Sequence, residues 1–441
     1  MNSKGLIFVA TFALSLLDCE QSAEVSIPMF PDGGLLRTGR LLSREQLYLF
    51  EGMFDVPKGS DVLGAQVAVR SSKGTISLLT DKNAGFSVLG AACLPDGRVV
   101  AEGYWQYPTL VEAGLVRLFV DPPEVAEALC AGYVPAPPVE LRGYYGRDNE
   151  FPREPFTLIW KHELKPWRGT FYTVAHHGAC ENTDHCGASS NSLESIRLAE
   201  RIGSNAAEID VRLTRDGVPI LFHDPGLSKS LVRGLFCNGQ VKDLSFAELR
   251  GSCQLRYGEL IPTVEEALEM MINDTEMEGA YLDVKEPEGI LPAARVASRT
   301  LAQLAERNSN ADPNDDRRFA VLIAITTDEA RTAWHAAKPQ LESEGLLVPP
   351  CLVEYDPDVV LAEGCTAWGP TWTEGPQSES VQRLQSSGAA TIFWTINQSE
   401  FIDEFLKQAK PNGIISARAS LLFYRYQTLG TPPRRPDGTH R

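Results

Sequence analysis

Acidic and imidazole groups lie among apolar residues in one short stretch of the sequence, Glu208 to Asp224. One residue separates Glu208 from Asp210, so on a β-strand both carboxylates leave the same face. Two like charges held side by side repel each other, and a cation between them removes that repulsion. His223 ends the apolar run that follows, and a histidine can take or give a proton near neutral pH. The stretch therefore predicts a cation site with a proton-transfer group close by.

Two further strand-like runs carry groups of the same kind. His176 and His177 follow one apolar run, and Asp283 and Lys285 alternate on another, which places that pair on one face. Each group also has an ordinary structural interpretation, because a strand-end carboxylate can be a cap and a histidine can be a structural residue. Independent caps do not explain why four consecutive runs carry such groups. Together the groups predict one functional rim.

The elements that must position these residues are strand-like and helix-like runs that alternate from Phe171 onward. Eight runs are candidate strands: Thr173–Ala175, Ala207–Val211, Pro219–Phe222, Ala280–Val284, Ala320–Ile325, Cys365–Trp368, Thr391–Ile396 and Gly413–Ser416. Amphipathic runs lie between most of them: Ser192–Ile202, Thr263–Met271, Asp328–Ala337, Glu379–Gln385 and Glu400–Gln408. Strands joined by helical crossovers predict an α/β fold, a (β/α)8 TIM barrel over residues 168–425, with reactive groups at the C-terminal ends of its strands.

The segment before the barrel has a different pattern. Residues 30–130 contain short alternating runs separated by Gly, Asp, Asn and Pro turns, which predict a small all-β N-terminal domain. No catalytic constellation is evident in it, so it is interpreted as a spacer or a binding module. Residues 131–167 are rich in Pro, Gly and charge and predict a linker, and residues 426–441 predict a polar, disordered tail.

The composition is that of a soluble globular protein. Of the 441 residues, 43% are hydrophobic and 22% are charged, which allows a large core. The formal net charge of −17 argues against nucleic acid as a partner, because a phosphate backbone needs a face of Lys and Arg. The expected partner is a small molecule, and a bound metal would reverse the sign of the charge locally.

The N-terminal residues 1–19 predict export. A short basic start precedes an apolar run, residues 6–17, that is too short to span a bilayer as a permanent helix. The motif at residues 16–19 resembles a bacterial lipoprotein cleavage site, which would place an acyl chain on Cys19, but Asp18 stands where that signal has a small residue. Two alternatives stay open: an extracellular or periplasmic chain, or one anchored at the cell envelope through Cys19.

Eight cysteines remain besides Cys19, an even number that suits disulfides in an oxidising compartment. Their order along the chain suggests local pairs, although other pairings are open: Cys93–Cys130, Cys180–Cys186, Cys237–Cys253 and Cys351–Cys365. A zinc site at Cys180, His185 and Cys186 is the weaker interpretation, because no second ligand pair stands at the spacing of a zinc finger.

These groups belong to a longer ordered set of motifs that resembles the glycerophosphodiester phosphodiesterases. The resemblance extends over roughly residues 171–422 and rests on seven stretches: Ala175–Gly178, Asn191–Ile196, Glu208–Asp224, Ile261–Leu268, Tyr281–Lys285, Trp394–Asn397 and Gly413–Ser416. It implies a TIM barrel that hydrolyses phosphodiesters with a divalent cation, often calcium or magnesium.

The resemblance also implies a role for each matching side chain: metal ligation by Glu208, Asp210 and Asp283, acid–base catalysis by His176 and His223, and binding of a phosphate oxygen by Lys285. His177 and Trp394 are further candidates for substrate binding. The physical chemistry agrees with these roles. Carboxylate oxygens suit a hard cation, which neutralises charge on the phosphoryl oxygens. Two histidines can move the protons of attack and departure. Attack by water and attack by a neighbouring hydroxyl of the substrate both stay open.

Two site positions depart from the family pattern. His177 stands where the family has Arg, and imidazole lacks the bidentate grip of a guanidinium, so phosphate contact or substrate preference is expected to differ. Asp283 stands where Glu is common, and the shorter side chain can still ligate a metal. Trp394 either stacks on the alcohol portion of the substrate or fills the core.

The start of the first barrel helix departs as well. The distance to Gly203 favours Asn191-Ser192 as the helix start, although Glu181-Asn182-Thr183 resembles the family's motif more closely. The residues between are then an insertion beside His176. This insertion either shapes the substrate pocket or is a surface loop tightened by a Cys180–Cys186 disulfide.

The sequence therefore predicts a phosphoric diester hydrolase that converts glycerophosphodiesters to sn-glycerol 3-phosphate and an alcohol. Two alternatives are kept. A phospholipase D-like activity on lysophospholipids or sphingomyelin predicts an apolar channel beside the cation, whereas glycerophosphodiesters need a small polar pocket. A barrel that has lost catalysis and only binds its ligand predicts that His176 or His223 is turned away from the acids.

Overall fold

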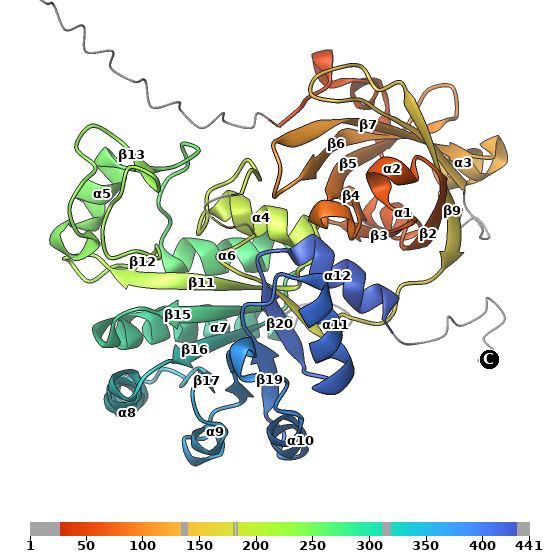
Figure 1. Ribbon diagram of the computed structural model, residues 1–441. Helices are drawn as coiled ribbons and strands as arrows, with labels where there is room; N and C mark the ends of the chain where they lie inside the picture. Colours follow the sequence, from red (N-terminus) through yellow and green to blue (C-terminus); the bar gives the residue numbers. More distant parts are fainter. Residues whose placement is uncertain (1–26, 134–139, 180, 182–183, 311–318, 430–441) are drawn as a thin grey trace, which may run out of the picture.

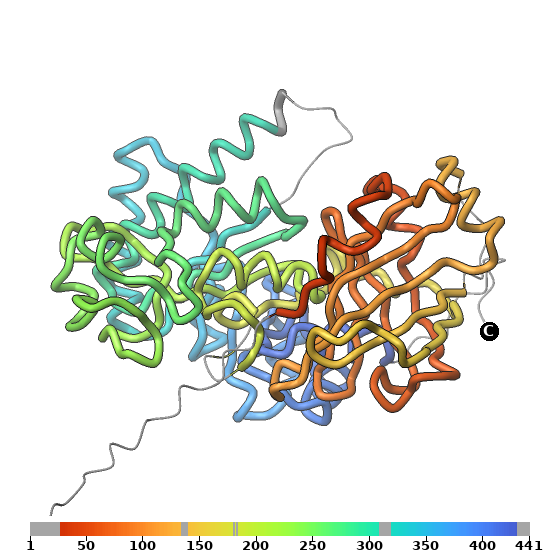
Figure 2. Tube along the Cα trace, turned by 90° about the horizontal axis from the view of Figure 1, so that it is seen from above, coloured from red at the N-terminus to blue at the C-terminus, as the bar shows by residue number. Residues whose placement is uncertain are grey.

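The computed structural model describes residues 27–133, 140–179, 181, 184–310 and 319–429, and it contains two closed β-barrels side by side (Figure 1, Figure 2). The chain forms the N-terminal barrel first and then the second, larger barrel. The predicted export segment, with Cys19, lies outside the described residues.

The N-terminal barrel is an antiparallel sheet in which β2 to β9 close on themselves and β1 adds to β5. Its strands are β1 (Arg40–Leu41), β2 (Gly52–Lys58), β3 (Gln66–Ser72), β4 (Thr75–Leu79), β5 (Phe86–Cys93), β6 (Val99–Tyr107), β7 (Glu112–Asp121), β8 (Glu140–Tyr145) and β9 (Glu154–His162). Three short helices accompany them: α1 (Arg44–Tyr48), α2 (Ser60–Leu63) and α3 (Pro123–Cys130). Inward-facing side chains form an apolar core, and the predicted all-β N-terminal region is confirmed.

The prediction of a linker over residues 131–167 is wrong, because β8 and β9 lie within it. These strands close the barrel between β7 and β2. Their buried side chains, among them Leu141, Phe156 and Leu158, alternate with exposed or half-buried residues. Glycine and charged residues between the buried positions hide that period of two in the sequence.

The second barrel confirms the predicted TIM barrel. Its parallel strands close through the pairs β10–β11 and β10–β20. The strands are β10 (Tyr172–Ala175), β11 (Ala206–Leu213), β15 (Gly279–Val284), β16 (Ala320–Ile325), β17 (Cys351–Val353), β18 (Ala367–Trp368), β19 (Ala390–Phe393) and β20 (Gly413–Ser416). Helices surround them: α4 (Leu193–Arg201), α6 (Val264–Asp274), α7 (Ile290–Asn310), α8 (Asp328–Ser343), α9 (Pro357–Ala362), α10 (Ser378–Ser386), α11 (Ser399–Gln408) and α12 (Ala419–Thr428).

One of the eight predicted barrel strands has another place. The run from Pro219 to Phe222 forms β12 (Pro219–Leu221), which pairs antiparallel with β11 and is not a strand of the barrel. The turn at Asp216-Gly217 is too short for a crossover, so it joins the two strands as a hairpin. The barrel strand that was not predicted is β17, which directly follows Pro349 and Pro350, two residues that interrupt the apolar run there.

Polar caps fix the ends of the helices beside the barrel mouth. Ser192 accepts a hydrogen bond from the amide of Ser195 and begins α4, as expected. Thr263 and Glu266 form a capping box that begins α6. At the other end of the barrel sequence, α12 continues to Thr428, so the tail predicted from residue 426 starts too early.

Residues 224–260 form an excursion between β12 and α6. It contains β13 (Val232–Arg233), α5 (Phe246–Ser252) and β14 (Gln254–Leu255), which pack over a small apolar core of their own. The excursion projects from the TIM barrel on the side away from the N-terminal barrel (Figure 1, Figure 2).

Besides the core inside the N-terminal barrel, a second apolar cluster spans the contact between the two barrels. Buried residues of the N-terminal barrel, such as Leu79 and Phe86, belong to the same cluster as the TIM barrel, and α4 and α12 lie against β3 and β4. Arg70 on β3 is fully buried, 3.6 Å from the carboxylate of Glu200 and 4.5 Å from the ring of Trp167. A buried guanidinium needs such partners, so this contact orients the barrels relative to each other.

Three of the four suggested cysteine pairs are confirmed as disulfides: Cys93–Cys130, Cys237–Cys253 and Cys351–Cys365. The suggested pair Cys180–Cys186 lies outside the described residues, since residue 180 does. Across the part of the chain that the structure describes, no helix has both the length and the apolar character that a membrane crossing requires.

Candidate active site

Three carboxylates meet at the C-terminal mouth of the TIM barrel. Glu208 and Asp210 leave β11 on one face, and Asp283 on β15 is the direct register partner of Asp210. One oxygen of each carboxylate lies within 4.8 Å of the others. Parallel neighbouring strands thus bring together acids that lie far apart in sequence, and the three can share one ion.

The electrostatics of this cluster fit a divalent cation. Glu208 and Asp210 are buried. Burial raises the pKa of Glu208 well above its ordinary range, and the charges of Asp210 and Asp283 raise it further. Burial would also raise the pKa of Asp210, but the charges of His177 and Lys285 lower it to about 2. Clustered, hard oxygen donors that repel one another are the donor set that calcium and magnesium prefer.

Lys285 lies between two of these acids. Its Nζ is 2.6 Å from Asp210 Oδ1 and 2.6 Å from Asp283 Oδ2. Burial lowers the pKa of Lys285, but the two carboxylates outweigh it and raise that pKa above its ordinary value. The ammonium group is therefore charged and partly neutralises the acids.

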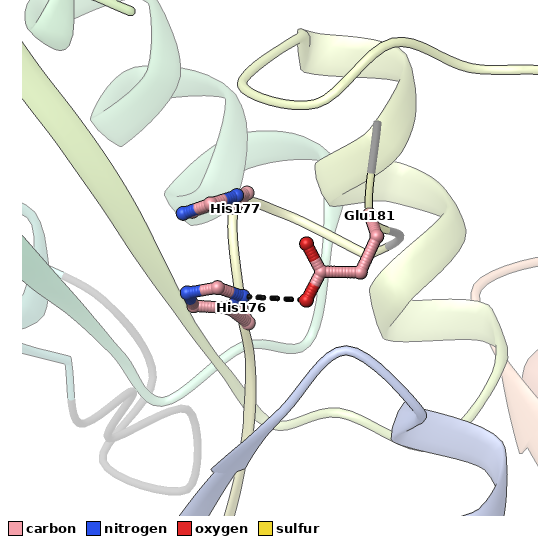
Figure 3. Close-up of side chains that lie close together, drawn as sticks. All are labelled: His176, His177 and Glu181. Carbon is pink, nitrogen blue, oxygen red and sulfur yellow. Dashed lines mark hydrogen bonds and ion pairs between the residues drawn. The ribbon is translucent and has the colours of Figure 1, made fainter. Parts of the chain in front are cut away.

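His176 and His177 follow β10, and their rings stack with centroids 3.6 Å apart (Figure 3). His176 Nδ1 lies 3.3 Å from Glu181 Oε1 (Figure 3). This hydrogen bond is the largest cause of the fall in the pKa of Glu181 to about 2. A carboxylate on Nδ1 leaves Nε2 of His176 for other partners.

His177 contacts the carboxylates of the site, so it is poorly placed to bind an anion. Its backbone amide donates a 2.9 Å hydrogen bond to Glu208, and its Nε2 lies 3.3 Å from Asp210 Oδ2. Burial lowers the pKa of His177 to about 4, so its ring is neutral at pH 7. A neutral ring cannot supply the positive charge that an arginine brings at this position.

His223 reaches the same mouth from the hairpin. Ligand atoms of His177, Asp210 and His223 lie within 4.8 Å of one another, although β12 is not a barrel strand. His223 Nδ1 lies 2.6 Å from Asp224 Oδ1, which leaves Nε2 available as in His176. Both predicted acid–base histidines thus lie at the mouth that holds the acids, each with a carboxylate on Nδ1.

Two polar residues in or next to the insertion belong to the site but were not predicted as site residues. Asn191 donates from Nδ2 to Asp210 Oδ2 at 2.6 Å, and its Oδ1 accepts from the Asp210 amide at 3.0 Å. Glu181, which contacts His176, lies in the stretch that resembles the family's helix start. The motif that begins at Asn191 was a signal that could have pointed to Asn191. No local signal points to Glu181, because its contact with His176 depends on the tertiary fold.

The described part of the insertion is held on several sides. Asp184 accepts from the Glu181 amide at 2.9 Å and pairs with Arg418. Ser189 donates twice to Glu259, at 2.8 and 2.7 Å. The backbone amide of His185 donates to the carbonyl of Pro108 in the N-terminal barrel, at 3.0 Å. The region beside His176 is therefore anchored to both barrels.

Glu354 is a further acid at this mouth. It follows β17, and it accepts a hydrogen bond from the hydroxyl of Tyr281 on β15. Burial, with a contribution from the charge of Asp283, raises the pKa of Glu354 to about 7. Glu354 was not predicted as a site residue because the strand before it, β17, was not predicted.

Trp394 follows β19 and is half-buried. It packs against the apolar cluster inside the barrel, and its Nε1 donates to the carbonyl of Gly369 at 2.7 Å. These are contacts of core packing, and stacking of Trp394 on a substrate stays a prediction.

An apolar cavity of about 170 Å³ lies at the other end of the barrel. Its lining includes the first residues of four strands, Tyr172, Ala206, Gly279 and Ala320. The cavity is therefore remote from the strand ends that carry the acids, and it is not an apolar channel beside them.

Comparison with known proteins finds a family match over the TIM barrel. The model of the glycerophosphoryl diester phosphodiesterase family matches residues 176–420. The probable glycerophosphodiester phosphodiesterase 2 of Mycobacterium tuberculosis is 27% identical over 243 residues, 53% of this chain and 83% of that protein. Human glycerophosphodiester phosphodiesterase 1 is 32% identical over 118 residues, 25% of this chain and 33% of that protein.

Two solved structures are similar to part of the chain. A phosphodiesterase from Oleispira antarctica, in complex with the product sn-glycerol-3-phosphate, superposes with a TM-score of 0.43 at 20% identity, over 58% of this chain and 97% of that one. A putative glycerophosphoryl diester phosphodiesterase from Silicibacter pomeroyi gives a TM-score of 0.43 at 18% identity, over 58% of this chain and 93% of that one.

Proposed function

This chain belongs to the glycerophosphoryl diester phosphodiesterase family, and on that premise we propose that it hydrolyses glycerophosphodiesters to sn-glycerol 3-phosphate and an alcohol with the help of a divalent cation. The observation that carries the proposal is the convergence of Glu208, Asp210 and Asp283 at one barrel mouth. His176 and His223 lie at the same mouth with their Nδ1 atoms held by carboxylates. Neither histidine is turned away from the mouth, whereas a barrel that has lost catalysis would predict that one of them is.

In this proposal the three carboxylates hold calcium or magnesium. The bound cation would stabilise negative charge on the phosphoryl oxygens. Lys285 and the neutral His177 line the same mouth, and Lys285 is the side chain there that could hold a phosphate oxygen by charge.

The histidines would move the two protons of hydrolysis. A bond forms between the attacking oxygen and phosphorus while the bond from phosphorus to the alcohol oxygen breaks. Nε2 of one histidine takes the proton of the attacking hydroxyl, and Nε2 of the other gives a proton to the departing alkoxide. Glu181 and Asp224 would keep each Nδ1 protonated and each ring oriented.

The test is alcohol release from a panel of phosphodiesters, with calcium, magnesium or a chelator. We expect the wild type to form sn-glycerol 3-phosphate only with a cation, and His176→Ala and Glu208→Gln to lower kcat by about 100-fold or more. His335→Ala is the matched control, because His335 is exposed on α8 and pairs with Glu363. Turnover retained in both site variants would refute the assignment.

A lysophospholipid belongs in the same panel, because the second candidate was phospholipase D-like action on lysophospholipids or sphingomyelin. The apolar cavity lies away from the acids and gives that candidate no support. Faster turnover of the lysophospholipid than of every glycerophosphodiester would favour it.

We also propose export and a division of labour between the barrels. The three disulfides support export, because such bonds persist in oxidising compartments. The N-terminal barrel, residues 40–162, would act as a structural companion of the TIM barrel, since the carboxylates and histidines of the mouth all come from the latter. Mass spectrometry of the chain from cells would show whether residues 1–19 are removed and whether Cys19 is acylated.

A further inference from the structure

The turn directly after β13 exposes two large apolar side chains. Leu235 is 95% exposed and the adjacent Phe236 is 80% exposed, the highest values among large hydrophobic residues in the described part of the chain. One exposed apolar residue is ordinary on a soluble protein. Two neighbours that both stand almost wholly in water form a small patch, and such patches mark places where another apolar phase makes contact.

A disulfide and a pair of strands fix the two ends of the turn. Cys237, directly after Phe236, forms a disulfide with Cys253. Val232 and Arg233, just before the turn, pair with β14. Val232, Cys237, Leu249 and Leu255 belong to the small core of the excursion, so the two exposed side chains do not belong to that core. The fold thus presents them outward on a fixed support.

Between Asp224 and Asp243 all charged side chains of the excursion have one sign. Residues 229–242 contain Lys229, Arg233 and Lys242 and no acidic residue, in a chain whose net charge is −17. All three cationic residues are exposed. Apolar side chains flanked by cations complement an anionic lipid surface, where apolar groups enter the acyl boundary and cations lie among the headgroups.

The position of the turn relates it to the site. His223 immediately precedes the excursion, and β12, which leads into it, pairs with β11 beside Asp210. The excursion points away from the N-terminal barrel (Figure 1, Figure 2), so that barrel does not cover it. A lipid surface that binds the turn would lie on the same side of the TIM barrel as the excursion.

We propose that residues 229–242 are a docking tip that inserts Leu235 and Phe236 into an anionic phospholipid surface. Docking is a binding property and does not require the proposed hydrolysis. If both hold, the enzyme meets diesters at or near a membrane.

The test is sedimentation of the full chain with vesicles of phosphatidylcholine alone or mixed with phosphatidylglycerol. Every protein carries Cys19→Ser, because an acyl chain on Cys19 would bind vesicles by itself. We expect the parent protein to bind the anionic vesicles, and the double variant Leu235→Ser with Phe236→Ser to bind about tenfold more weakly or less.

The chain offers a matched control pair. Leu347 is 62% exposed and Val348 is 36% exposed, and they lie in the loop before β17, at the end of the barrel opposite the mouth. Leu347→Ser with Val348→Ser is expected to leave vesicle binding unchanged. Lys229→Glu with Lys242→Glu is expected to weaken binding to anionic vesicles by about tenfold.

Two outcomes would overturn the proposal. One is that the parent protein binds neither vesicle; the other is that the Leu235 and Phe236 variant binds as the parent does. Sizing chromatography in which that variant alone loses self-association would assign the turn to a second copy instead. Because the measurement is binding, none of these outcomes changes the test of hydrolysis.

Discussion

Asn191 and Asp210 form two hydrogen bonds with each other, one from the Asn191 amide group at 2.6 Å and one from the Asp210 backbone at 3.0 Å. The side chain of Asn191 therefore orients a proposed metal ligand without being one. Partners of this kind commonly affect metal affinity by 10–100-fold.

We expect Asn191→Ala to weaken calcium or magnesium binding by about tenfold or more, because the Asp210 carboxylate loses the group that fixes its orientation. Calorimetric titration of the cation measures the change. Asn238→Ala, an exposed position in the excursion, is the control. Equal affinities in both variants would show that Asn191 does not position the ligand.

Lys285→Met tests whether the ammonium group stands in for part of the cation's charge. Without metal, the variant leaves Asp210 and Asp283 facing each other, so we expect a loss of about 2–4 kcal/mol in the free energy of unfolding, less than for a fully buried pair. Added calcium should restore more stability to the variant than to the wild type. Denaturant unfolding with and without calcium measures both, and an identical calcium effect in the two proteins contradicts this account. Lys338→Met, on α8, is the control.

Glu181→Gln tests the carboxylate on Nδ1 of His176. We expect kcat to fall by about tenfold while KM stays unchanged, because the His176 ring loses the carboxylate that holds its orientation. Glu181→Ala should lower kcat further. Glu259→Gln is the matched control, since Glu259 anchors the same insertion through Ser189 without touching a histidine. Similar losses in the Glu181 and Glu259 variants would assign the effect to the insertion as a whole.

Glu354 predicts a pH dependence of stability. Burial raises the pKa of Glu354 from its ordinary 4.5 to about 7 in the folded protein. The folded state therefore holds this proton more tightly than the unfolded chain, so the stabilisation is complete below about pH 4.5 and is lost as the pH rises through about 7. Its size is at most about 3 kcal/mol.

Glu354→Gln should remove this part of the pH dependence and leave the rest. Urea unfolding at about pH 5 and about pH 8, in the presence of a chelator, measures the difference between the variant and the wild type. A difference that does not change between the two pH values would contradict the assignment. Glu374→Gln, an exposed residue, is the control.

The parts of the site that follow from local spacing could be predicted from the sequence. Alternation places Glu208 with Asp210, and it places Asp283 with Lys285; parallel pairing then brings the two strands together. The parts that depend on tertiary contact could not be predicted. Glu181 meets His176 only because the insertion folds back on the mouth.

Errors in the fold have equally local causes. β17 was not predicted because Pro349 and Pro350 interrupt the apolar run before it, and Glu354, which follows β17, was therefore not predicted either. The apolar run at Pro219 resembles a barrel strand. The turn at Asp216-Gly217 is too short for a helical crossover, however, so the run pairs with β11 as a hairpin. β8 and β9 have too few buried positions to outweigh the glycine and charge around them.

The core that β3 and β4 share with α4 and α12 has a consequence for how the molecule melts. Unfolding of either barrel would expose the apolar cluster between them, because both barrels contribute side chains to it. We therefore expect a single cooperative heat-absorption peak in calorimetry, with Arg70→Met lowering its temperature as a whole. Two separate peaks would mean that the barrels melt independently. A single peak would instead mean that the heat resistance of the barrel mouth depends in part on the N-terminal barrel, although the carboxylates and histidines of the mouth all come from the TIM barrel.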